Sequence, residues 1–228
     1  AVEGPAAVDE EKATTATHAI PLRHGMTAGE LAMMMNTERM LGCDLRIIPV
    51  EGWQRGMLHD QTGLPWINPS PNMRSLGEAL LYPGIGLLEF SVSVGRGTDT
   101  PFEVLGAPYI DDLRLSYELN KLGLAGVQFT PVRFTPTASV FKGEACGGVR
   151  MAVTDRSALR PVDVGVAIVC ALQGLYPKEF KLPLVDTLLN RAASVKAVRA
   201  GESWKKVVAG WSEEIAAFGE RRREFLRY

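Results

Sequence analysis

The chain has 228 residues, of which 46% are hydrophobic and 22% are charged, and this composition is typical of a globular protein. The formal net charge is −1, so there is no basic surplus to neutralise a phosphate backbone, and we expect no nucleic-acid partner. No apolar run reaches the roughly 18 residues of a membrane span, so we expect none.

Signatures of metal and cofactor sites are missing from the sequence. Cys43, Cys146 and Cys170 are far apart and have no metal-ligand spacing. There is no phosphate loop, dinucleotide fingerprint, serine-hydrolase elbow or zinc-protease motif. We therefore predict no metal and no cofactor.

The first 19 residues differ in composition from the rest. They are small, polar and charged, without periodicity and without an apolar targeting segment. We interpret residues 1–19 as a linker and residues 20–228 as one α/β domain.

The next stretch contains clear local signals. Thr27 and Glu30 form a capping box that predicts a helix over 28–38. Aliphatic residues predict a short strand over 44–48 that ends before a proline. Residues 51–74 lack a period and predict a long irregular loop, of a kind that is usually functional or mobile.

The remaining elements alternate between helices and strands, which predicts an α/β (α+β) fold with a mixed sheet and flanking helices. We expect helices over 75–82, 110–122, 162–175, 182–189, 194–200 and 203–223, and strands over 85–94, 102–105, 127–135 and 148–153.

Within the long loop, residues 63–72 are rich in proline and in neutral polar groups. Trp66 offers a flat face for stacking on a sugar, while Ser70 and Asn72 suit hydroxyl or amide groups. The alternative is a rigid structural loop with Trp66 packed in the core.

The predicted strand over 85–94 places Glu89, Ser91 and Ser93 on one face, because side chains alternate along a strand. A carboxylate and two hydroxyls on one strand face indicate the border of a cleft, since buried polar groups need partners. The alternative is a solvent-facing strand surface.

Arg96 lies between two glycines that allow close backbone approach, and its guanidinium could hold a substrate carboxylate with two hydrogen bonds. The alternative is a salt bridge to Asp99 or Glu103 that fixes a turn. Two histidines are further candidates: His24 precedes the capping-box helix, and His59 is adjacent to Asp60, which suggests acid/base chemistry, although adjacent side chains in a strand or helix point apart. The alternative is that both are ordinary surface or packed residues.

Several segments, in this order, resemble the NamZ-type exo-β-N-acetylmuramidases, a bacterial family long known only as a domain of unknown function. They are PLRHGMTAGEL (21–31), TGLPW (62–66), SPN (70–72), SVGRGT (93–98), PFE (101–103), GAP (106–108), FTPT (134–137), CGGV (146–149), VTDR (153–156) and, more weakly, FLRY (225–228).

The resemblance implies an enzyme that releases N-acetylmuramic acid from non-reducing ends of peptidoglycan fragments. Family members pair a catalytic N-terminal Rossmann-like domain with a C-terminal auxiliary domain, and a cleft lies between the two. This chain resembles the auxiliary domain, preceded by a linker from the N-terminal domain. The resemblance further implies a periplasmic or secreted location, and little activity for the chain alone.

Site roles follow from joining the resemblance to the chemistry. Glu89 is the candidate catalytic carboxylate, because glycoside hydrolysis usually needs two carboxyl groups. Arg96 is expected to bind the lactyl carboxylate of muramic acid and Asn72 its N-acetyl group. The other expected substrate-binding residues are His24, Trp66, Ser70, Ser91 and Thr98.

The sequence departs from the family beside this motif. The family has Glu-Gly-Thr-Asn and one more residue before Ser-Val-Gly-Arg-Gly-Thr, and here that stretch is one residue shorter. Without a gap the family's Glu aligns with Leu88, and in either alignment the bulky Phe90 enters and the Asn is lost. These changes favour an alternative function, a non-catalytic saccharide- or muropeptide-binding module. A purely structural partner domain is a third possibility.

Overall fold

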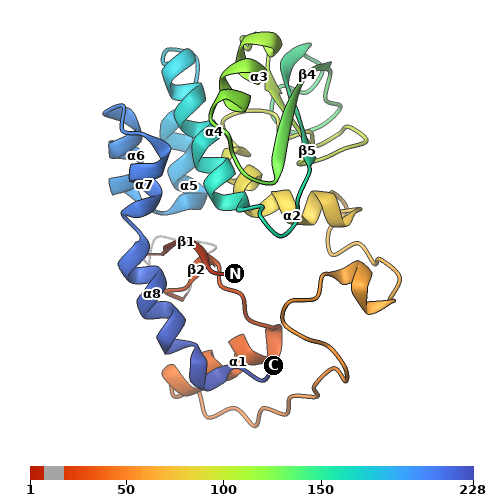
Figure 1. Ribbon diagram of the computed structural model, residues 1–228, viewed down its shortest axis with the longest axis vertical. Coiled ribbons are helices and arrows are strands. Elements are labelled where there is room, and N and C mark those ends of the chain that lie inside the picture. The colour runs from red at the N-terminus through yellow and green to blue at the C-terminus, as the bar shows by residue number, and fades with distance from the viewer. Residues whose placement is uncertain (8–17) are drawn as a thin grey trace.

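The computed structural model describes residues 1–7 and 18–228, arranged in an upper and a lower part (Figure 1). The upper part holds a small sheet and most of the helices. In the lower part, the pair of strands β1 (Glu3–Ala6) and β2 (Pro21–Arg23) lies near helix α1 (Ala28–Glu38). The last helix, α8 (Ser212–Arg221), runs down from the upper part alongside them.

The sheet of the upper part has the strand order β3-β5-β4, and all its pairings are antiparallel. Its strands are β3 (Val104–Ala107), β4 (Val127–Phe134) and β5 (Cys146–Val153). Burial alternates at the start of β4, as expected for a strand with one face on the core. The predicted α/β class with helices flanking a sheet is confirmed, but the sheet is antiparallel and not mixed as predicted.

Two helices cross by direct backbone contact beside this sheet. They are α2 (Leu76–Ile85) and α4 (Pro161–Leu175), the latter largely buried. A Cβ added to Gly84 would lie 1.7 Å from the carbonyl oxygen of Pro161, and one added to Gly165 would lie 2.4 Å from that of Gly84. Only glycine therefore permits this approach.

The other helices close the upper part and confirm most of the predicted ranges. They are α3 (Asp112–Lys121), α5 (Asp186–Leu189), α6 (Ala192–Arg199) and α7 (Trp204–Ala209). The helix predicted over 203–223 is divided, because the chain turns at Gly210 and buries Trp211, whose indole N–H donates to Ser194 Oγ at 2.9 Å.

A second, small hydrophobic core joins the two ends of the chain. Met26 and Met34 from the α1 region pack against Phe218 of α8 and Phe225 near the C-terminus. This packing fixes the final residues of the chain, including Tyr228, beside α1. The capping box at Thr27 and Glu30 is formed as predicted.

The strand predicted over 85–94 is wrong. Helix α2 continues through Pro83 to Ile85, a 3₁₀ turn follows over Gly86–Leu88, and the chain then turns again. Proline normally interrupts a helix, since it has no N–H to donate, but here the turns on both sides of it are held in the core. Glu89, Ser91 and Ser93 therefore do not share a strand face.

The strand predicted over 44–48 is also absent, because residues between Glu38 and His59 form neither helix nor strand. The region predicted as a linker contains β1, which pairs with β2 and buries Glu3; residues 8–17 lie outside the described part. Within the part of the chain that is described, no helix has the length and apolar character needed to cross a bilayer.

Candidate functional site

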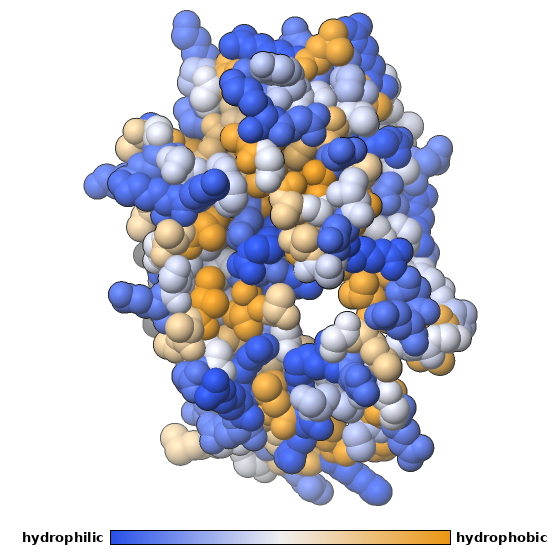
Figure 2. Space-filling view, viewed as in Figure 1, coloured by the Kyte–Doolittle hydropathy of each residue, from blue (hydrophilic) through white to orange (hydrophobic). Residues whose placement is uncertain are grey.

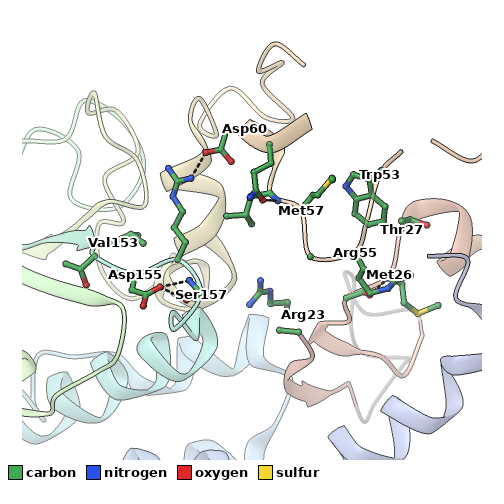
Figure 3. Close-up of a pocket in the computed structure, with 17 residues that line it drawn as sticks. Arg23, Met26, Thr27, Trp53, Arg55, Met57, Asp60, Val153, Asp155 and Ser157 are labelled. Carbon is green, nitrogen blue, oxygen red and sulfur yellow. Dashed lines mark hydrogen bonds and ion pairs between the residues drawn. The ribbon is translucent and has the colours of Figure 1, made fainter. Parts of the chain in front are cut away.

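A polar cleft of about 1080 Å³ lies where three segments meet, and Ala1 also lines it (Figure 3). Arg23–Thr27 comes from the junction of β2 with α1, residues 53–61 from the long loop, and Val153–Ser157 from the turn after β5. In the space-filling view an opening separates the long loop from the body of the molecule (Figure 2). The cleft thus joins the lower and upper parts.

An ion pair spans the mouth of the cleft. Arg156 Nη1 contacts Asp60 Oδ2, and both side chains are about half exposed. The hydrogen bond from Arg156 lowers the pKa of Asp60, so this carboxylate stays ionised. Because exposed pairs of this kind stabilise a fold only weakly, a competing carboxylate can replace Asp60 at little cost.

A second carboxylate, Asp155, is held by its own turn. Its Oδ1 accepts hydrogen bonds from the Ser157 N–H at 2.8 Å, the Ser157 hydroxyl at 2.6 Å and the Ala158 N–H at 3.2 Å. These bonds, led by the Ser157 hydroxyl, lower the pKa of Asp155. Neither cleft aspartate is therefore suited to act as a proton-donating general acid.

Arg55 is fixed at the lower wall by several acceptors. Its guanidinium donates to the Gly25 carbonyl at 2.8 Å, to Glu30 Oε1 at 2.5 Å and to the Tyr228 carbonyl at 3.3 Å. Glu30 is fully buried, which opposes its ionisation, but hydrogen bonds from Arg55 and from the backbone N–H groups of Arg227 and Thr27 lower its pKa overall. Arg55 is thus a positioned cation.

Arg23 is tied to the upper part through Glu3. The two side chains form an ion pair, and Glu3 Oε2 also accepts from the backbone N–H of Val162 at 3.2 Å, in the first turn of α4. The helix dipole favours a carboxylate there. Glu3 therefore links the strand that supplies Arg23 to the helix of the upper core.

His24 lies between two cleft residues but is used within the fold. Its Nδ1 accepts from the Met26 N–H at 3.2 Å, and Arg222 donates to its carbonyl at 2.8 Å. Burial, assisted by the charge of Arg222, lowers the pKa of His24, so the ring is neutral at neutral pH.

The loop over residues 63–72 makes internal contacts. Trp66 is half-buried, its indole N–H donates to the Met73 carbonyl at 3.3 Å, and its ring meets that of His59 edge-on at 5.0 Å. Ser70 pairs with Met73 through its backbone. Trp66, Ser70 and Asn72 are not among the described residues that line the cleft.

Glu89 and Arg96 are brought together, but as partners of each other. Arg96 Nε lies 2.7 Å from Glu89 Oε1, and its guanidinium stacks over the Phe102 ring at 5.2 Å. The predicted salt bridge from Arg96 thus forms with Glu89 and not with Asp99 or Glu103.

The two hydroxyls predicted beside them bond to backbone carbonyls. Ser91 Oγ donates to Lys181 at 3.2 Å, and Thr98 Oγ1 donates to Gly95 at 2.6 Å. Like Glu89 and Arg96, neither belongs to the described lining of the cleft.

One carboxyl outside the cleft lining has a raised pKa. Burial, and then the charge of Glu78, raise the pKa of Glu103, although Arg150 at 3.9 Å opposes this shift. It is the carboxyl with a raised pKa among the described residues. The sequence contains Glu103 in the PFE segment but predicts no catalytic role for it.

None of the described residues that line the cleft was predicted as a site residue, including its charged side chains Arg23, Arg55, Asp60, Asp155 and Arg156. Arg23 and the Asp155-Arg156 pair belong to segments that carry the family resemblance, and Arg55 lies in the long loop predicted to be functional or mobile. Over residues 1–7 and 18–228 no cluster of His, Cys, Asp or Glu is arranged to hold a metal ion.

Comparison with known proteins finds two family matches. The family described as exo-beta-N-acetylmuramidase NamZ, C-terminal, matches residues 80–228, and its N-terminal counterpart matches residues 1–77. The matches divide the chain between residues 77 and 80, whereas the sequence interpretation places the boundary at residue 20.

Individual relatives are longer than this chain. It is 36% identical to the peptidoglycan beta-N-acetylmuramidase NamZ of Bacillus subtilis, over 100% of the chain and 56% of the relative. Two crystal structures of DUF1343 family proteins from Bacteroides fragilis superpose with TM-scores of 0.90 and 0.76 at 28% and 27% identity. The alignments cover the whole chain and 62% of each structure. The chain therefore spans little more than half the length of these relatives.

Proposed function

The chain belongs to the exo-β-N-acetylmuramidase NamZ family, and from that membership we propose that it forms part of a glycoside hydrolase that releases N-acetylmuramic acid from non-reducing ends of peptidoglycan fragments. The observation that carries the proposal is the polar cleft, in which two segments of the family resemblance, 21–31 and 153–156, meet.

The chemistry of muramic acid suits this cleft. The sugar carries a lactyl carboxylate, which a guanidinium can bind with two hydrogen bonds. Arg156 is half exposed and already paired with the carboxylate of Asp60. When the lactyl carboxylate binds, it replaces the carboxylate of Asp60 at Arg156, so the guanidinium is paired with a negative charge in both states. Trp53 also lines the cleft and offers an aromatic face to the sugar ring.

Hydrolysis needs a proton donor as well as a base or nucleophile. The lowered pKa values of Asp60 and Asp155 keep both carboxylates ionised, which suits them to stabilise developing positive charge on the sugar. In our proposal the acid comes from outside the cleft lining described above: either from the upstream part, or from Glu89, the carboxyl that the sequence predicts for this role. Glu89 must first leave its ion pair with Arg96 to reach a sugar in the cleft.

The proposed partner is the upstream part of the N-terminal domain, with a Rossmann-like fold, and the proposed location is the periplasm or the cell exterior. The relatives are longer than this chain, which supports a cleft completed by residues outside it. The isolated chain is then expected to bind the sugar without turning it over.

The test is hydrolysis of a chromogenic β-N-acetylmuramide by this chain, with and without the upstream part encoded by its parent gene. Turnover is expected only when both parts are present. In the active protein Arg156→Ala should raise KM about tenfold or more with a smaller change in kcat, whereas Arg223→Ala, at an exposed position, should change neither. Absence of turnover in a folded protein with both parts would contradict the hydrolase proposal.

A non-catalytic saccharide-binding module is the second candidate function. It is favoured by Leu88, which is fully buried where the ungapped family alignment places a glutamate, and by the exposed Phe90 beside it. Saturable binding of a muramic acid glycoside without turnover by the longer protein would establish this alternative. Replacement of Glu89 by Gln with unchanged kcat/KM would remove Glu89 from the mechanism.

A further inference from the structure

The stretch from Met40 to Val50 exposes an unusual run of large apolar side chains. Ile48 is 81% exposed, Val50 59% and Leu41 56%, and Met40 and Leu45 are exposed as well. Single exposed apolar residues are normal on a protein surface, but a contiguous group of them indicates an interaction site. We call residues Asp44–Val50 the apolar segment.

The backbone of the apolar segment is unpaired. No backbone hydrogen bond joins Asp44–Pro49 to another backbone group of the described residues. The sequence nevertheless favours a strand here, since Leu45, Ile47 and Ile48 are aliphatic and two are β-branched. A strand needs a neighbouring strand for its hydrogen bonds, and the described chain offers none at this place.

The apolar segment is held at its two ends. Before it, Cys43 exchanges two hydrogen bonds of 3.0 Å with the Asn36 side chain, and at its end the Val50 N–H donates to the Tyr228 hydroxyl at 2.7 Å. Ile47 packs close to Gly29 of α1. The segment is therefore presented in a fixed place although it has no regular structure.

A mainly apolar groove of about 760 Å³ lies against this segment. Its lining includes Ile47, Ile48, Trp53, Leu64 and Tyr228. The groove and the unpaired backbone together offer the two contacts that an added strand uses: main-chain hydrogen bonds and pockets for alternate side chains.

We propose that Asp44–Val50 forms a β-strand by pairing with the edge of a sheet in the upstream part of the N-terminal NamZ domain. The segment falls within residues 1–77, which match that domain, and the solved relatives extend well beyond the 62% that this chain covers. The proposal rests on the two-part organisation proposed above and identifies its surface. Under this proposal, the strand predicted over 44–48 forms in the longer protein.

Amide hydrogen exchange tests this pairing and does not depend on hydrolytic activity. The amides of Asp44–Ile48 should exchange at least about 100-fold more slowly in the protein that includes the upstream part than in the 228-residue chain. The amides of β4 and β5 should be protected equally in both proteins, since their ladder is complete here. Fast exchange of the apolar segment in both proteins would overturn the proposal.

Two aspartate variants give a matched comparison. Ile48→Asp should abolish the protection and lower the Tm of the longer protein, and it should leave the Tm of the chain alone nearly unchanged. Leu113→Asp, at a similarly exposed residue on α3, should leave the protection intact. If the chain alone forms a dimer that Ile48→Asp disperses, the apolar segment pairs with a second copy of the chain and the proposal fails. If the longer protein shows the protection but does not hydrolyse the muramide, the proposed function is refuted and the strand pairing still stands.

Discussion

Glu30 is expected to control both the stability of the lower part and the placement of Arg55 in the cleft. We consider Glu30→Gln, which keeps the size of the side chain and removes its charge. The carboxylate accepts from Arg55 at 2.5 Å, from the Arg227 N–H at 2.7 Å and from the Thr27 N–H at 2.8 Å. An amide has one oxygen, so it cannot accept all three bonds, and its NH₂ group must face a donor.

The cost follows from these contacts. A hydrogen bond between charged groups contributes about 1.5–3 kcal/mol, and a buried donor left without an acceptor costs about 1–3 kcal/mol. We therefore expect Glu30→Gln to lower the free energy of unfolding by about 3 kcal/mol. For a chain of this size, that corresponds to a fall in Tm of about 6–12 °C.

Denaturant unfolding over a range of pH provides the assay. Because the folded pKa of Glu30 is lowered, its contribution is present above the unfolded value of about 4.3 and is lost as the pH falls through the folded value. The difference between wild type and Glu30→Gln should thus shrink in acid. Glu144→Gln, at an exposed position, should change stability by less than about 0.5 kcal/mol. A Glu30→Gln effect below 1 kcal/mol, or one independent of pH, would refute the reasoning.

Three further predictions follow from glycine packing, histidine burial and thiol burial. Gly84→Ala should destabilise the fold by about 2 kcal/mol or more, because the added Cβ would meet backbone atoms of α4. Gly174→Ala has open space around it and should stabilise the fold by up to about 1 kcal/mol, and thermal unfolding measures both effects. His24 should titrate below its usual pKa by NMR, so its neutral form stabilises the fold and this contribution falls as the solution is acidified; a normal or raised pKa would contradict its burial. Cys43 is exposed, whereas burial raises the pKa of the Cys170 thiol to about 11, so a thiol reagent at pH 8 should label Cys43 first; faster labelling of Cys170 would be the contrary result.

Local signals in the sequence predicted much of the fold. The capping box at Thr27 and Glu30 and the alternation over 127–135 depend on residues a few positions apart, and both elements formed. The strand predicted over 85–94 failed because the preceding helix was predicted to end at residue 82, before Pro83, whereas packing of Gly84 against α4 keeps the helix intact. That contact joins residues far apart in the chain, and no local pattern reports it.

The candidate site was harder to predict for the same reason. Arg156 and Asp60 are 96 positions apart, and Arg55 reaches the carbonyl of Tyr228 across 173. The sequence identified Glu89 and Arg96 as residues able to do chemistry, but it could not reveal that they neutralise each other. The family segments were the better guide, because two of them, 21–31 and 153–156, meet at the cleft.

The central claim is that muramic acid binds in the cleft, and an NMR titration of the isotope-labelled chain with a β-glycoside of N-acetylmuramic acid tests it most directly. The account predicts saturable shifts at Arg55, Arg156 and Ser157, with little change at Leu119 on the distant α3 helix. The matching N-acetylglucosamine glycoside, which lacks the lactyl carboxylate, should bind more weakly. Shifts confined to residues 89–98, or no saturable shift at all, would contradict the claim.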